Sequence, residues 1–299
     1  MEIEQERTVI FTYWLRGLPW DEEQRARLQQ TLWMYCVGGW KDGRVVFWQI
    51  DHNGIPRAAK LMKYLPDGHR DKTQHPGWIY NQDGCRQQLD PDHHTILKPL
   101  FGSHLLNLYP QAVINIVESE KTAIIMANYY GNHDAQIWLA CGGLKHLQLD
   151  SLQPLIDQGR TIWLWPDKDG REAWQEVCDK LGYDKCRVYT HFFDTCWREE
   201  DGDKADVADI AIRMMTTGEG PRKDTGKEQG ATEQSATASD QSGVPPDPHL
   251  EIMRAIGEYV VIHPDGEPFL PEDEMADPRL RMWREILRQA YNFNKSRKE

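Results

Sequence analysis

Three carboxylates in the middle of the chain follow runs that are typical of buried strands. Glu118 comes directly after AVINIV, whereas Asp167 and Asp169 come after TIWLW and a proline. The carboxyl ends of parallel strands lie at one edge of the sheet, and ligands of α/β sheets bind beyond that edge. These side chains therefore converge there if the two strands are neighbours. Crowded carboxylates repel one another unless a cation lies between them. Mg²⁺ is the hard, oxygen-seeking cation that suits such ligands, and Mn²⁺ can replace it.

Other acids near these three could either cap helices or bind the metal. Glu120 lies two residues after Glu118, and an acidic run that includes Asp203 and Asp206 follows the fourth apolar run. An acid at the start of a helix often only caps it, so we expect Glu120 to be a helix-start residue and rank capping first for each later acid. Asp206 is nevertheless included as a candidate extra metal ligand.

The elements that must position these acids alternate between strand and helix. Short apolar runs at 112–117, 136–140, 161–165 and 186–192 are separated by helix-like segments at 121–131, 144–157 and 170–182. Apolar runs of this length between helices indicate strands that are buried on both faces. The pattern predicts an α/β fold in which a parallel sheet is flanked by crossover helices.

The N-terminal part has a different rhythm, with a helix predicted at 20–34 and two strands at 43–50 and 55–64. The intervening DHNG is a tight-turn sequence, since Asn-Gly tolerates the positive φ that such turns need. Basic residues gather here, and we interpret them either as ordinary solvated charges or as a track that contacts nucleic-acid phosphates. The candidate nucleic-acid-binding residues are Arg57, Lys60, Lys63, Arg70, Lys72 and, beside the acidic cluster, Lys121.

Composition divides the rest of the chain. The segment 217–248 holds almost no large apolar residues and is predicted to be a disordered linker. Apolar residues return in 249–299, where we expect a helical segment that docks on the rest or binds a partner. The predicted domains are therefore 1–110 (α+β), 111–216 (α/β), the linker and the C-terminal segment.

Bulk properties exclude several classes of protein. The net charge of −12 argues against a protein that coats nucleic acid by charge alone. No apolar run is long enough to span a membrane, and the first residues lack the features of a secretory signal, so we expect a cytoplasmic protein. The six cysteines are scattered without a CxxC pair, which favours single reduced thiols over a zinc site.

The ordered motifs VINIVESEKTA, ACGGL, IWLWPDKDGREAW and GDKADVADIA resemble the Toprim domain of bacterial primases, topoisomerases and related nucleases. That resemblance implies that Glu118 is a general acid/base or metal-side glutamate and that Asp167 and Asp169 bind the metal, the three forming the catalytic set. The preceding stretch resembles the part before Toprim in the bacterial-type primase core. Residues 8–215 as a whole resemble an uncharacterised primase-like family of bacterial mobile elements.

We therefore expect a primase-like nucleotidyltransferase that uses Mg²⁺ to join nucleoside triphosphates on single-stranded DNA during replication of a mobile element. A replicative helicase or a separate zinc-binding module would be its partners, because neither a GxxxxGK[ST] motor motif nor a zinc module is recognisable. Ser119 and Thr122 depart from the glycine and aspartate that primases usually have there. Two alternatives stay open: a non-catalytic nucleic-acid-binding replication-accessory protein on a degenerate Toprim scaffold, and a Toprim nuclease.

Overall fold

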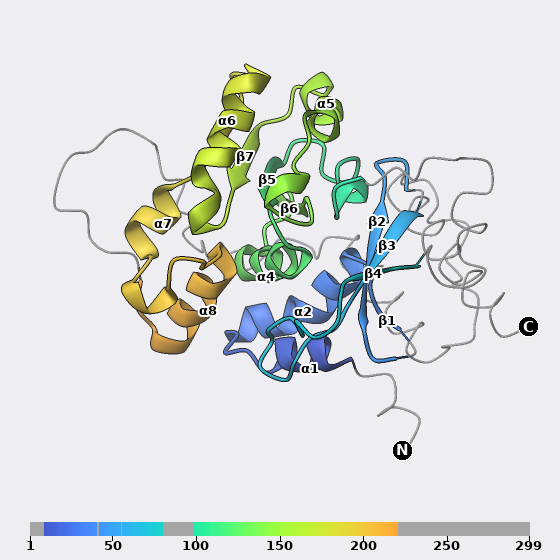
Figure 1. Cartoon of the computed structure of the whole chain (residues 1–299), viewed down its shortest axis with the longest axis vertical. Coiled ribbons are helices and arrows are strands. Elements are labelled where there is room, and N and C mark those ends of the chain that lie inside the picture. The colour runs from blue at the N-terminus through green and yellow to red at the C-terminus, as the bar shows by residue number, and fades with distance from the viewer. Residues whose placement is uncertain (1–8, 41, 55, 80–98, 221–299) are drawn as a thin grey trace, which may run out of the picture.

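The computed structural model describes residues 9–40, 42–54, 56–79 and 99–220 (Figure 1). Most of the predicted linker and the whole C-terminal segment lie outside these residues, and the predicted domain boundaries stay a prediction. Within the described residues, no helix has the length and apolar character needed to cross a membrane. The elements before residue 110 are α1 (Ile10–Arg16), α2 (Glu22–Met34), β1 (Val37–Gly39), β2 (Val45–Ile50), β3 (Pro56–Met62), β4 (Gly77–Trp78) and the 3₁₀ turn η2 (Ser103–Leu105).

The elements after residue 110 alternate as the sequence predicts. They are β5 (Val113–Val117), α4 (Glu120–Tyr130), β6 (Gln136–Ala140), η3 (Leu144–His146), α5 (Leu149–Asp157), β7 (Ile162–Trp165), η4 (Lys168–Gly170), α6 (Arg171–Leu181), β8 (Cys186–Val188), α7 (His191–Cys196), η5 (Glu199–Asp201) and α8 (Val207–Thr217).

The N-terminal elements confirm the predicted helix and hairpin. Asp21 caps α2 by accepting from the backbone N–H of Gln24, whose side chain in turn accepts from the backbone of Asp21. The strands β1 to β4 form an antiparallel sheet in sequence order, with Phe47 opposite Lys60 in the central β2–β3 pair. Since side chains alternate across a strand, one face of this sheet contributes Val45, Phe47 and Met62 to the main core, and the other carries a small cluster around Trp40.

The C-terminal elements form the expected parallel sheet, with strand order β6-β5-β7-β8. The β5–β7 pair is parallel, with Val117 opposite Trp165, which confirms that the two strands bearing the acids are neighbours. The predicted fourth strand is wrong in its length, because β8 ends at Val188 and α7 begins at His191. The helix buries Phe192 and Phe193 against the core, which explains why the apolar run continues past the strand.

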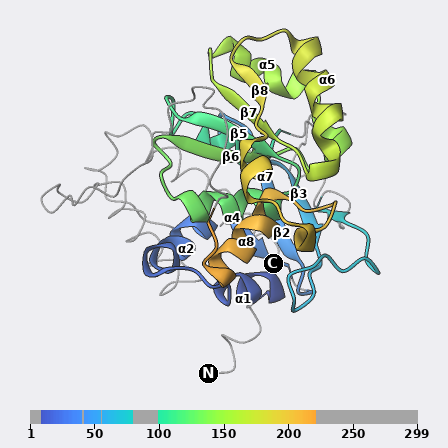
Figure 2. The same ribbon diagram turned by 90° about the vertical axis from the view of Figure 1, so that its left-hand side faces the viewer.

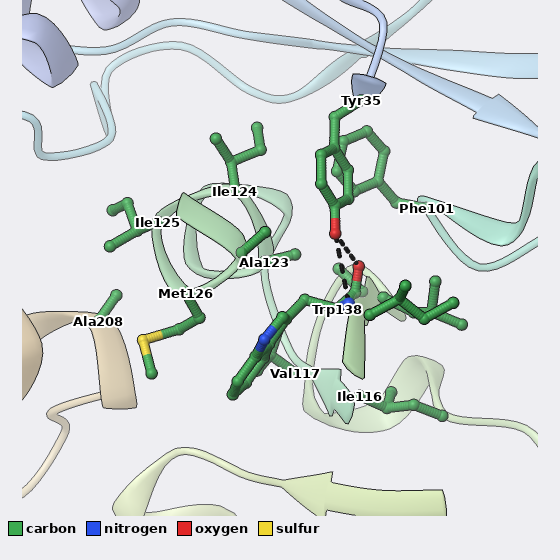
Figure 3. Packing of buried hydrophobic residues seen from close by; sticks show 14 of the residues in the cluster. Tyr35, Phe101, Ile116, Val117, Ala123, Ile124, Ile125, Met126, Trp138 and Ala208 are labelled. Atoms are coloured by element: carbon green, nitrogen blue, oxygen red, sulfur yellow. Dashed lines mark hydrogen bonds between the residues drawn. The ribbon is translucent and has the colours of Figure 1, made fainter. Parts of the chain in front are cut away.

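Helix α4 lies between the parallel sheet and α2, and it also packs against α8 (Figures 1 and 2). Its buried residues Ile124, Ile125 and Met126 share one continuous core with both sheets. Figure 3 shows how Tyr35, just after α2, reaches the backbone of β6 at Trp138: its hydroxyl donates to the carbonyl at 2.7 Å and accepts from the N–H at 3.3 Å. The N-terminal elements are thereby fixed to the parallel sheet.

A buried ion pair makes a second connection between the two sheets. Lys60 on β3 is 8% exposed and Glu120 on α4 is 1% exposed, and the Nζ of Lys60 lies 2.9 Å from Oε2 and 3.1 Å from Oε1 of Glu120. Glu120 starts its helix, as expected, but its carboxylate is committed to a residue 60 positions earlier in the chain. Either charge alone at this depth would be left without compensation.

We predict that Lys60→Met lowers the free energy of unfolding by about 3–5 kcal/mol, because Glu120 is then a buried charge without a partner. The double variant Lys60→Met/Glu120→Met should recover most of that loss, since both charges are gone. The measurement is chemical denaturation followed by circular dichroism.

Lys63→Met is the matched control for this prediction. Its Nζ donates to a backbone carbonyl, that of Asp42, at 3.0 Å in an exposed position. The change should therefore cost no more than about 0.5 kcal/mol. Equal stabilities for Lys60→Met and Lys63→Met would contradict the role given to the ion pair.

Candidate functional site

Glu118 occupies the position directly after β5 and is largely buried, with 9% of its surface exposed. Its Oε1 accepts a hydrogen bond from the backbone N–H of Asp167 at 3.1 Å, which ties the end of β5 to the end of β7. A β-carbon added at Gly170 would lie 2.8 Å from the same Oε1. Glycine at position 170 therefore leaves the room that the Glu118 carboxylate occupies.

Asp167 and Asp169 lie on the turn between β7 and α6, so the structure brings the predicted acids together. Burial raises the pKa of Asp167 from 3.8 to about 8, and the neighbouring charges of Asp206, Glu118, Asp169 and Asp209 add to the effect in that order. Burial also raises the pKa of Glu118, with the charges of Asp169 and Asp206 acting in the same direction. The cluster thus has more negative charge than its surroundings balance.

Asp206 joins this cluster from α8. It caps that helix, as ranked first from the sequence, because its Oδ1 accepts from the backbone N–H of Asp209 at 2.8 Å. Its Oδ2 accepts from the hydroxyl of Thr122 at 2.6 Å, across 84 residues of chain. Since Thr122 has a single hydroxyl proton, the 2.7 Å contact between the Ser119 and Thr122 hydroxyls must use the proton of Ser119.

The departures at Ser119 and Thr122 therefore have a structural role. Ser119 caps α4 by accepting from the backbone N–H of Thr122 at 3.1 Å, and Thr122 holds Asp206 against the start of that helix. Sequence reasoning treated Thr122 as a missing carboxylate, whereas the structure brings a carboxylate to it from α8. No local signal links residues so far apart, so Thr122 and Asp209 could not be assigned to the cluster in advance.

The donor set fits a hard divalent cation, because Glu118, Asp167, Asp169 and Asp206 offer only carboxylate oxygens. Within the described residues, no group of three or more His, Cys, Asp or Glu side chains is arranged so that it could already hold a metal ion. A cation here would be held by one or two of these carboxylates, with waters and substrate phosphates as its other ligands, which is how Mg²⁺ is commonly bound.

Several of the candidate basic residues already have partners. Lys60 is held by Glu120, and the Nε of Arg57 lies 2.8 Å from Asp51 in a second ion pair. Lys63 donates to a loop carbonyl, and Lys72 is exposed. Arg70 lies opposite Tyr64 in an isolated antiparallel bridge, and burial raises the pKa of the Tyr64 hydroxyl, which the charge of Arg70 lowers.

Two lysines lie directly at the acids. Nζ of Lys121 is 3.9 Å from Asp209 and 5.6 Å from the centre of the Trp14 ring. Lys168, between the two aspartates of the turn, was missed by sequence reasoning although its position within DKD could have pointed to it. Its Nζ lies 2.7 Å from the exposed Asp203 and 3.3 Å from the centre of the Trp197 ring.

The raised pKa of Asp167 has a consequence for stability. In the native state its carboxyl holds a proton up to about pH 8, whereas the unfolded chain releases it near 3.8. In EDTA the native state should therefore lose stability as the pH rises between these values, and Asp167→Asn should remove that loss. At pH 8 we expect the variant to be more stable by on the order of 2–5 kcal/mol. Denaturant titrations at about pH 4 and pH 8 measure this, and a difference that does not change with pH would contradict it.

Solved structures of primases are among those to which the chain is similar. It matches the primase fragment of the bacteriophage T7 primase-helicase with 17% identity and a TM-score of 0.43, over 62% of this chain and 66% of that one, slightly less than two thirds of the latter. It matches the zinc-binding and RNA polymerase domains of the Aquifex aeolicus primase with 14% identity and a TM-score of 0.34, over 60% of this chain and 40% of that one.

Sequence comparison gives the family. No curated protein matches the chain significantly. A family model described as a domain of unknown function, DUF6371, matches residues 10–168, which is more than half of the chain and runs from α1 to the turn that carries Asp167. The chain belongs to the DUF6371 family.

Proposed function

We propose that the chain is a primase-like nucleotidyltransferase that joins nucleoside triphosphates on a single-stranded DNA template. The observation that carries this proposal is the register of β5 and β7, which puts Glu118 beside Asp167 at the carboxyl edge of the parallel sheet. Asp169 and Asp206 complete a set of acids whose mutual repulsion a divalent cation would relieve. The Toprim-like order of these acids agrees with that chemistry.

Each group in the site has a distinct task in this proposal. Asp167 and Asp169 would hold Mg²⁺ or Mn²⁺ from the turn between β7 and α6, and Asp206 would support it from α8. When bound, the cation would supply positive charge against the negative charge that develops during nucleotidyl transfer. Glu118, whose pKa is raised mainly by burial, is placed to hold or take a proton beside the carboxylates of the turn.

Cations at the edge of the acidic cluster are the proposed contacts to phosphates. Lys121 and Lys168 are near the acids, although they are paired with Asp209 and Asp203, and Arg70 would add a further contact. Lys63 and Lys72 would extend the contacts along the template. Lys60 and Arg57 are engaged in ion pairs of their own, and their contact with a phosphate requires that they leave Glu120 and Asp51.

The wider setting is part of the same proposal. We place the protein in the cytoplasm, in replication of a mobile element, where a replicative helicase or a separate zinc-binding module would deliver the template.

A second candidate function is a non-catalytic replication-accessory protein that binds nucleic acid. It is favoured by the finding that, among the described residues, no three potential ligand side chains are already gathered around one point. Such a protein should bind single-stranded DNA equally well in EDTA and in Mg²⁺.

We predict that the purified protein makes primers from ribonucleoside triphosphates on single-stranded DNA in Mg²⁺ or Mn²⁺. Glu118→Gln and Asp167→Asn should each reduce the rate by about 100-fold or more, because each removes a charge that the transition state requires. Gel analysis of labelled products measures the rate.

The matched control is Asp179→Asn, which removes an exposed carboxylate on α6, on the same helix that follows the acidic turn. It should retain the rate of the wild-type protein. Synthesis that is unchanged in Glu118→Gln and Asp167→Asn would contradict the proposal, as would metal-dependent nicking of DNA without synthesis, which is the outcome for a Toprim nuclease.

A further inference from the structure

Two thiols outside the acidic cluster lie in direct contact. The Sγ atoms of Cys178, in the last turns of α6, and Cys186, the first residue of β8, are 3.3 Å apart. Both are free cysteines. A disulfide bond is about 2.05 Å long, so the sulfur atoms need to approach by little more than about 1 Å to become bonded.

The chain between the two cysteines can accommodate that approach. Helix α6 ends at Gly182, which has φ of 61° and no neighbour within 4 Å of an added β-carbon. The backbone N–H of Cys186 donates to the carbonyl of Tyr183 at 3.0 Å, which forms a tight return into β8. The two sulfurs therefore face each other across a short turn that has free space at its glycine.

The two thiols have unequal chemistry. The hydrogen bond with Cys186 lowers the pKa of Cys178, whereas the pKa of Cys186 is raised by the same contact and by burial. Burial instead raises the pKa of Cys36 and of Cys141 to about 12, which leaves those thiols protonated and unreactive. Within this pair we take Cys178 as the attacking thiolate, and Cys186, whose sulfur is in contact with it, is placed to resolve the product.

We propose that Cys178 and Cys186 form an intramolecular disulfide when the protein meets a hydroperoxide. The Cys178 thiolate attacks one peroxide oxygen, the O–O bond breaks, and a sulfenic acid forms with loss of water or an alcohol. The Cys186 sulfur then attacks the Cys178 sulfur, the S–O bond breaks and a second water leaves. Two thiols are oxidised by two electrons and one hydroperoxide is reduced, with no other reactant.

The position of this bond gives it an effect on the fold. Cys186 pairs with Ile162 in the β7–β8 ladder, and α6 follows directly after the turn that carries Asp167 and Asp169. A covalent link between α6 and β8 would therefore fasten α6, which follows the acidic turn, to the strand that pairs with β7, which precedes that turn. Closure of a loop this short is expected to raise the melting temperature by on the order of 5 °C.

The test uses the full-length protein, treated with hydrogen peroxide, alkylated and digested with trypsin. Because trypsin cleaves after Arg171, Lys180, Lys185 and Arg187, the disulfide appears as a cross-link between the peptides 172–180 and 186–187. We expect this cross-link in the wild-type protein together with the rise in melting temperature, and neither in Cys186→Ser. In Cys186→Ser, Cys178 should instead accumulate as a sulfenic acid that dimedone traps.

Cys196→Ser is the matched control, since Cys196 is a buried cysteine whose sulfur contacts the hydroxyl of Thr195 rather than a second thiol. It should form the cross-link as the wild-type protein does. The proposal is overturned if Cys178 and Cys186 in peroxide-treated wild-type protein are alkylated as fully as in untreated protein. It is also overturned if the cross-link is found only in dimers on a non-reducing gel. Both the alkylation measurement and the non-reducing gel use the wild-type protein, so they remain decisive even if a serine variant fails to fold.

Discussion

The parallel pairing of β5 with β7 is the constraint on which the rest of the site depends. Because Val117 is in register with Trp165, the residues that follow the two strands meet, and the Glu118 carboxylate accepts from the backbone of Asp167. The same pairing crowds negative charge at one edge of the sheet and raises the pKa of Asp167 to about 8. The structure thus holds acids together that would separate if they were free to move.

What keeps them together is the packing around α4. This helix contacts the parallel sheet, α2 and α8. The residues at its start cap the helix and bind side chains of two other elements. Ser119 caps it, Glu120 binds Lys60 of the antiparallel sheet, and Thr122 holds Asp206 of α8. The start of α4 is therefore the point at which the antiparallel sheet, the parallel sheet and the last described helix are joined.

Much of this arrangement could be predicted from local sequence. The apolar runs placed β5, β6 and β7, the glycine after Tyr130 placed the end of α4, and the rule for parallel sheets brought Glu118 and Asp167 together. Prediction failed where the determining contact is distant in sequence or where the local pattern is ambiguous. The partnership of Lys60 with Glu120 and that of Thr122 with Asp206 span 60 and 84 residues. The run 186–192 was predicted as one strand, but β8 ends at Val188 and α7 begins at His191, and this helix buries Phe192 and the following Phe193.

We propose that the carboxylates at the ends of β5 and β7 bind a divalent cation. The most direct measurement is calorimetric titration of the full-length protein with Mn²⁺ near neutral pH, without nucleotide or DNA. We predict saturable binding by the wild-type protein and its loss in the double variant Glu118→Gln/Asp167→Asn, while Asp179→Asn binds as the wild type does. Absence of saturable binding in the wild-type protein, or equal binding by the double variant, would contradict it.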